Sequence, residues 1–105
     1  MKVVAVTACI TGIAHTYMAQ AALEKESKKR GYEILVETQG GMGVENEISQ
    51  EEVDEADFAI LAIAVGIEGE ERFDEKRESG KLLEIDPSEV IKNPEVIFDK
   101  LQKLS

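Results

Sequence analysis

Two short runs of nearly uninterrupted apolar residues constrain the fold of this chain more than any other feature. Lys2–Ala8 and residues 57–65 are rich in Val, Ile, Leu and Ala, and they lack the polar and apolar alternation of a strand with one face in water. Such runs are typical of strands buried on both faces, which occur in parallel sheets covered by helices. We therefore expect both runs to lie inside a parallel sheet.

Helix-like segments separate these runs from two further strand-like segments. Apolar residues recur at helical spacing from Tyr17, and a basic stretch then leads to Gly31, a frequent residue type at helix ends. Residues 32–38 and Leu82–Ile85 are predicted as the second and fourth strands. The remaining segments are predicted as a glycine-rich loop (39–43), a capping-box helix from Ser49, a helical turn at 70–73, an exposed loop or short helix (74–80) and helices from Pro87 and Pro94.

Strands that alternate with helices predict right-handed crossovers and a parallel sheet. We therefore expect one α/β domain over residues 1–105, built on an open four-stranded parallel sheet of order 2-1-3-4 with helices on both faces, as in flavodoxin-like and Rossmann-like folds. In such sheets, functional groups collect beyond the carboxyl ends of the strands, beside the first strand. Cys9 directly follows the first strand and is therefore expected at that place.

The composition excludes several kinds of partner. A formal net charge of −10 would repel nucleic acid and anionic lipid, and no apolar run approaches the roughly 20 residues that span a bilayer. A single cysteine fits a reducing compartment, and with one histidine it cannot complete a zinc shell. We expect a cytoplasmic monomer without metal or cofactor, which meets a membrane only through another protein.

The segment between Cys9 and the first helix has the features of an anion site. Backbone N–H groups and the helix N-terminus converge there, and a helix terminus stabilises a nearby negative charge by up to about 2 kcal/mol. Gly12 permits conformations closed to other residues, and the hydroxyls of Thr11 and Thr16 can donate to an anion. The thiolate of Cys9 is therefore favoured, and the residues expected to surround a bound phosphate are Ile10, Thr11, Gly12, Ile13, Ala14, His15 and Thr16.

The segment from Cys9 to Ala19 resembles the active-site segment of fructose-family IIB components of the bacterial phosphoenolpyruvate-dependent sugar phosphotransferase system. Similarity continues in parts of the chain up to Phe73. The resemblance implies that Cys9 accepts a phosphoryl group from a phosphohistidine on a IIA partner and passes it to fructose or a related sugar during uptake by a membrane IIC permease. We place the partner surface at Gln39, Gly40, Met42 and Arg72.

Departures from the family pattern leave two alternatives. Ile10 stands where the family usually has proline, and no aspartate follows the third strand, so a regulatory IIB-like paralogue without transfer activity is one alternative. The other is a thiolate-loop phosphatase. Low-molecular-weight tyrosine phosphatases have arginine six residues after the cysteine, whereas this chain has His15 there, and the missing arginine favours a carrier over a hydrolase.

Overall fold

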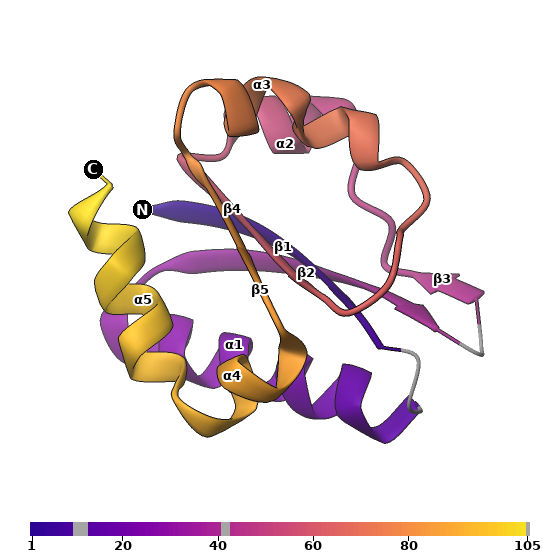
Figure 1. The fold of residues 1–105 in the computed structure, drawn as a ribbon. Coiled ribbons are helices and arrows are strands. Elements are labelled where there is room, and N and C mark those ends of the chain that lie inside the picture. The colour runs from indigo at the N-terminus through magenta and orange to yellow at the C-terminus, as the bar shows by residue number, and fades with distance from the viewer. Residues whose placement is uncertain (10–12, 41–42, 105) are drawn as a thin grey trace.

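A sheet with helices on both faces forms the core of the computed structural model, which describes residues 1–9, 13–40 and 43–104 (Figure 1). The strands are β1 (Lys2–Ala8), β2 (Glu33–Gly40), β3 (Gly43–Glu45), β4 (Phe58–Ile63) and β5 (Leu82–Ile85). They lie in the order β3-β2-β1-β4-β5, and every neighbouring pair except β2 and β3 is parallel. The parallel part therefore has the order predicted for four strands.

The prediction of a purely parallel four-stranded sheet is wrong, because a fifth strand pairs antiparallel with β2. The predicted glycine-rich loop is instead part of a hairpin in which Gly40 pairs with Gly43 and Thr38 with Glu45. Gly43 has a φ of +88°, which favours glycine. All three residues of β3 are exposed, so no alternation of apolar residues marked it as a strand. Gly41 and Met42 lie outside the described residues.

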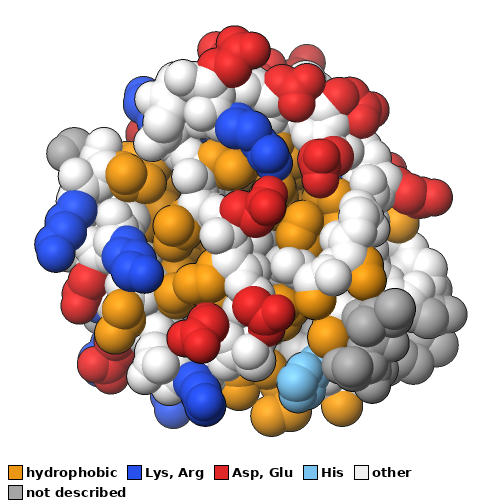
Figure 2. All heavy atoms as spheres, viewed as in Figure 1, with side chains coloured by type: hydrophobic (Ala, Val, Ile, Leu, Met, Phe, Trp, Pro, Cys, Tyr) orange, Lys and Arg blue, Asp and Glu red, His pale blue; other side chains and the backbone are white. Residues whose placement is uncertain are grey.

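The helices divide between the two faces of the sheet. One face carries α1 (Ile13–Arg30), α4 (Pro87–Lys92) and α5 (Pro94–Lys103), and the other carries α2 (Gln50–Glu55), the 3-10 helix η1 (Glu70–Phe73) and α3 (Asp74–Glu78) (Figure 1). A large group of acidic side chains gathers at the end of the molecule that carries α2 and α3 (Figure 2). Within the described ranges, no helix is long and apolar enough to cross a membrane.

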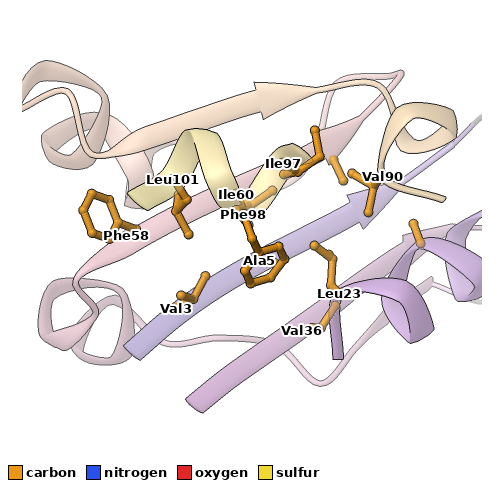
Figure 3. Close-up of a cluster of buried hydrophobic side chains, with 12 residues drawn as sticks. Val3, Ala5, Leu23, Val36, Phe58, Ile60, Val90, Ile97, Phe98 and Leu101 are labelled. Carbon is orange, nitrogen blue, oxygen red and sulfur yellow. The ribbon is translucent and has the colours of Figure 1, made fainter. Parts of the chain in front are cut away.

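Successive residues of β1 supply two separate hydrophobic cores. Val3 and Ala5 point toward α1 and α5, where they pack with Leu23 and Phe98 (Figure 3). Val4 and Val6 point to the other face, where their cluster includes Val53 of α2 and Phe73 of η1. Because both faces of β1 are buried, the strand needs apolar residues at successive positions, as its sequence predicts.

Local signals mark the helix ends correctly. Gly31 adopts a φ of +76° directly after α1. Ser49 and Glu52 form a reciprocal capping box at the start of α2. The Asp86 side chain accepts the backbone N–H of Ser88 at the start of α4. These caps fix where each helix begins or ends. Because β1 pairs parallel with β2 and β4, the carboxyl ends of the three strands lie at one edge of the sheet, next to Cys9.

Candidate functional site

Cys9 lies directly beyond the carboxyl end of β1, in the middle of the sheet. The preceding residue is held in place by a hydrogen bond from the N–H of Ala64 to the carbonyl of Ala8, with an N–O distance of 3.0 Å. Cys9 itself is partly exposed. A partly exposed thiol directly after a strand that is paired on both sides can meet a reactant without a large rearrangement of that strand. Ile10, Thr11 and Gly12 lie outside the described residues.

The imidazole of His15 lies close to the thiol. Its Nδ1 lies 3.8 Å from the Sγ of Cys9, and the residue is exposed in the first turn of α1. Asp86, directly after β5, interacts electrostatically with the same ring. The hydroxyl and backbone N–H of Ser88, together with the charge of His15, hold the pKa of Asp86 below its usual value. His15 thus lies near both the thiol and the end of β5.

The remaining described members of the predicted phosphate loop differ in exposure. Ala14 is exposed, whereas Thr16 is buried and its carbonyl accepts a hydrogen bond from the hydroxyl of Thr7. The hydroxyl of Thr16 has no hydrogen-bond partner among the described residues. It faces Gly40, where an added Cβ would lie 3.8 Å from it. A buried hydroxyl of this kind can donate to an anion that enters the site.

A cavity of about 430 Å³ opens beside the thiol. It is lined by Ala8 and Cys9 at the end of β1, by Gly40 and Val44 of the β2–β3 hairpin, and by Val65 and Glu68 of the segment after β4, which is called the wall of the cavity here. Gln39 also lines it. The thiol of Cys9 lines this cavity, so a small group carried by another molecule can approach the sulfur from it.

A buried ion pair joins Glu37 and Arg72 on the face of the sheet that carries α2 and η1. The sequence did not predict this pair. Glu37 is fully buried in β2, and Arg72 of η1 donates to both of its carboxylate oxygens. Burial raises the pKa of Glu37, but hydrogen bonds from Arg72, the backbone of Ile48 and Gln39 outweigh it and hold that pKa below its usual value. A glutamate inside an otherwise buried strand was the available signal.

The predicted partner-surface residues occupy different environments. Gly40 is exposed, whereas Gln39 is 8% exposed and the Arg72 side chain 12% exposed, because both take part in internal hydrogen bonds. Met42 lies outside the described residues. The partner surface thus stays a prediction for these positions. Within the described ranges, no three His, Cys, Asp or Glu residues lie close enough together to hold a metal ion.

Comparisons with known proteins agree on one family. The model described as "PTS system, Lactose/Cellobiose specific IIB subunit" matches residues 4–100. The chain is 45% identical over 102 residues to the "PTS system fructose-like EIIB component 2" of Escherichia coli K12, covering 96% of this chain and 92% of that protein. It is also 46% identical to the "Fructose-like PTS system EIIBC component" of the same organism, again over 96% of this chain but only 20% of that longer protein.

Solved structures give the same result. A domain from the fructose-specific IIABC component of Borrelia burgdorferi superposes with a TM-score of 0.87 at 43% identity, covering 97% of this chain and 93% of that chain. A predicted fructose-specific IIB from Escherichia coli superposes with a TM-score of 0.89 at 34% identity, covering 98% of this chain and 88% of that chain. The shared fold therefore extends over nearly all of both chains.

Proposed function

The chain belongs to the IIB subunit family of the phosphotransferase system, and we propose that it is a phosphocarrier whose Cys9 accepts a phosphoryl group from a phosphohistidine on a IIA partner and passes it to a sugar. The observation that carries the proposal is the position of the thiol. It is partly exposed at the carboxyl end of the central strand, it lies 3.8 Å from an imidazole nitrogen, and a cavity opens beside it. Carrier chemistry needs a sulfur that two successive partners can reach.

The first transfer moves the phosphoryl group from nitrogen to sulfur. The sulfur of Cys9 attacks phosphorus, the P–N bond of the donor breaks as the S–P bond forms, and the thiol proton ends on the released imidazole nitrogen. In the second transfer a sugar hydroxyl attacks phosphorus, the S–P bond breaks, and the hydroxyl proton passes to the sulfur. No group is oxidised or reduced, so the reaction needs no further reactant.

The described residues around the sulfur suit this chemistry. The imidazole of His15 would lie beside the negative charge that builds on sulfur and on the phosphoryl oxygens, where a ring N–H can donate to it. The hydroxyl of Thr16, which pairs with no group in the described part of the chain, is available to donate to a phosphoryl oxygen. Together with the N-terminus of α1, these groups would hold the phosphoryl group between the two transfers. Ile10, Thr11, Gly12 and Ile13 complete the proposed phosphate loop.

The partners follow from the family. A relative that combines IIB and IIC parts in one chain supports a IIC permease as the site of the second transfer, and it supports a cytoplasmic location at the inner face of the membrane. The named relatives are fructose-like, while the family model is described by lactose and cellobiose. We propose fructose or a related sugar as the final acceptor, with residues 1–105 acting as one IIB unit and as a monomer.

The proposal is tested by incubating the protein with a IIA domain that carries a radioactive phosphoryl group on histidine. We expect one label per chain, located on Cys9 by peptide mapping. The label should be lost in Cys9→Ser. Label retained by Cys9→Ser would overturn the assignment. Hydrolysis of an aryl phosphate by the isolated protein would instead support the phosphatase alternative, and an unlabelled, intact Cys9 would support the regulatory one.

A further inference from the structure

We propose that Glu37, Gln39 and Arg72 form a positioning device, here called the brace, that holds one wall of the Cys9 cavity for phosphoryl transfer. The inference rests on the proposed function and adds residues that do not touch the sulfur. The brace connects β2 to the segment between β4 and η1, and it acts on the space into which a partner's group must enter.

The inner half of the brace is the ion pair. The Nη1 of Arg72 lies 2.8 Å from Oε1 of Glu37, and Nη2 lies 2.9 Å from Oε2. Oε1 also accepts the backbone N–H of Ile48 at 2.7 Å, and Arg72 donates to the carbonyl of Ile48 and, through Nε at 2.8 Å, to that of Gly69. The pair therefore fixes two connecting segments that have no strand pairing of their own at these positions.

The outer half of the brace reaches the cavity. The Nε2 of Gln39 donates to Oε2 of Glu37 at 2.6 Å and to the carbonyl of Glu68 at 2.9 Å. The backbone N–H of Glu68 in turn donates to Oε1 of Gln39 at 2.8 Å. Gln39 thus holds the backbone of Glu68 as a neighbouring strand would, through one donor and one acceptor. Both residues line the cavity together with Cys9.

Stability alone does not explain why these three side chains are polar. A buried ion pair contributes little net stability, and apolar side chains of similar volume often do as well or better. Apolar side chains cannot, however, bind backbone groups at defined points. The brace makes directed hydrogen bonds to the backbone of Ile48, Glu68 and Gly69. Its contribution is therefore to hold these backbone groups at fixed positions.

The brace should therefore affect how a partner's group binds, and leave the reactivity of the sulfur unchanged. The wall at Val65 and Glu68 lines the same cavity as Gly40 and Val44 of the β2–β3 hairpin, and Gln39 joins the backbone of Glu68 to β2. When the wall is fixed, the space is preorganised for the donor's imidazole ring. When it is loose, part of the binding free energy is used to order it, which weakens binding of the partner.

The kinetic test compares Gln39→Leu with a matched control, Gln50→Leu. Gln50 also donates to a backbone carbonyl of the same segment, that of Arg72 at 3.0 Å, but it is exposed and does not line the cavity. Gln39→Leu removes all three hydrogen bonds of that side chain and is expected to raise the KM for phosphorylated IIA about tenfold, with kcat within about twofold of wild type. Gln50→Leu should change neither. Equal KM values for the two variants would overturn the proposal.

A second test does not depend on phosphoryl transfer. The rates at which Cys9 reacts with iodoacetamide and with a bulky fluorescent iodoacetamide are measured separately. Gln39→Leu should change the ratio of the two rates at least about threefold, because the cavity wall has moved, and should leave the rate with the small reagent within about twofold. An unchanged ratio would contradict the brace even if phosphate transfer were intact. If the wild type accepts no phosphoryl group but the ratio changes as expected, the proposed function fails and the brace stands as a device that shapes the cavity.

Arg72→Lys provides a further variant in case Gln39→Leu unfolds. Lysine retains the positive charge but has a single nitrogen, so it cannot reproduce the two parallel bonds from Nη1 to Oε1 and from Nη2 to Oε2. The ratio of the two alkylation rates should shift in the same direction as in Gln39→Leu, and thermal unfolding should remain cooperative. A wild-type ratio in a folded Arg72→Lys protein would argue against a positioning role for the ion pair.

Discussion

The guanidinium of Arg72 and the carboxylate of Glu37 meet as a two-pronged ion pair, although the residues are 35 positions apart in the chain. The Glu37 side chain is completely buried and the Arg72 side chain is 12% exposed. The pair joins β2 to η1, and Glu37 also accepts a hydrogen bond from Gln39, which lines the Cys9 cavity. Its removal is therefore expected to affect both the stability of the protein and the shape of the site.

Glu37→Gln should change how stability depends on pH. Because the pKa of Glu37 lies below its value of about 4.5 in the unfolded chain, the carboxylate stabilises the fold fully above that pH. This contribution is lost as the pH falls below about 4.5 and through the folded-state pKa. The variant should be less stable than wild type by roughly 3–5 kcal/mol at pH 7, because Arg72 is left without its counter-ion.

Urea unfolding at a series of pH values checks this expectation. The difference in the free energy of unfolding between wild type and Glu37→Gln should shrink as the pH falls from about 5 to 3. Glu75→Gln, at an exposed position on α3, serves as the control and should follow wild type. If the difference in the free energy of unfolding stays constant over this range, the ionised pair of Glu37 and Arg72 does not stabilise the fold.

Gly69→Ala should destabilise the protein more than Gly31→Ala. Both glycines have positive φ angles, +70° and +76°, so alanine costs about 1–2 kcal/mol of backbone strain at either position. At Gly31 the added Cβ meets nothing within 4 Å, but at Gly69 it would lie 2.7 Å from the Nε of Arg72. Since that guanidinium is held by Glu37, it cannot move aside freely. Thermal unfolding of the two variants makes the comparison, and equal losses would contradict it.

His15→Gln should slow phosphoryl transfer without affecting stability. The ring lies 3.8 Å from the sulfur, so the variant loses a contact to the reacting atom, and a loss of about 1 kcal/mol in the transition state corresponds to roughly a fivefold lower rate. The residue is exposed, so the melting temperature should stay near that of wild type. Single-turnover transfer from phosphorylated IIA measures the rate. A wild-type rate in the variant would show that His15 takes no part in phosphoryl transfer.

Phe98→Ala should reduce the free energy of unfolding by about 3–5 kcal/mol. The Phe98 ring is fully buried between α5 and the sheet (Figure 3), stacks with Tyr32 at a centroid distance of 6.2 Å, and lies under the guanidinium of Arg30 at 5.7 Å. Val96→Ala on the same helix, at a residue 48% exposed, should cost less than about 0.5 kcal/mol. Urea titration separates the two, and a small loss in Phe98→Ala would mean that the core refills the space.

The sequence was informative wherever the structural signal is local. The uninterrupted apolar run of Lys2–Ala8 marked a strand buried on both faces, and Gly31, Ser49 and Asp86 marked helix ends through backbone conformation or capping. The hairpin strand Gly43–Glu45 was missed because its three residues are exposed and pair with only the last part of β2. Nothing in a short exposed segment rich in glycine distinguishes a strand from a loop.

From the sequence alone, hydrophobic periodicity and the alternation of helix and strand determined a parallel core with Cys9 at the carboxyl end of its central strand. These features depend on residues within a few positions of one another, so they can be recognised without a partner. Only the tertiary structure decided that Glu37 meets Arg72, that Gln39 binds the backbone of Glu68, and that a cavity opens beside the thiol. Those contacts join distant parts of the chain, and a polar residue in a sequence does not reveal which distant group will satisfy it once both are buried.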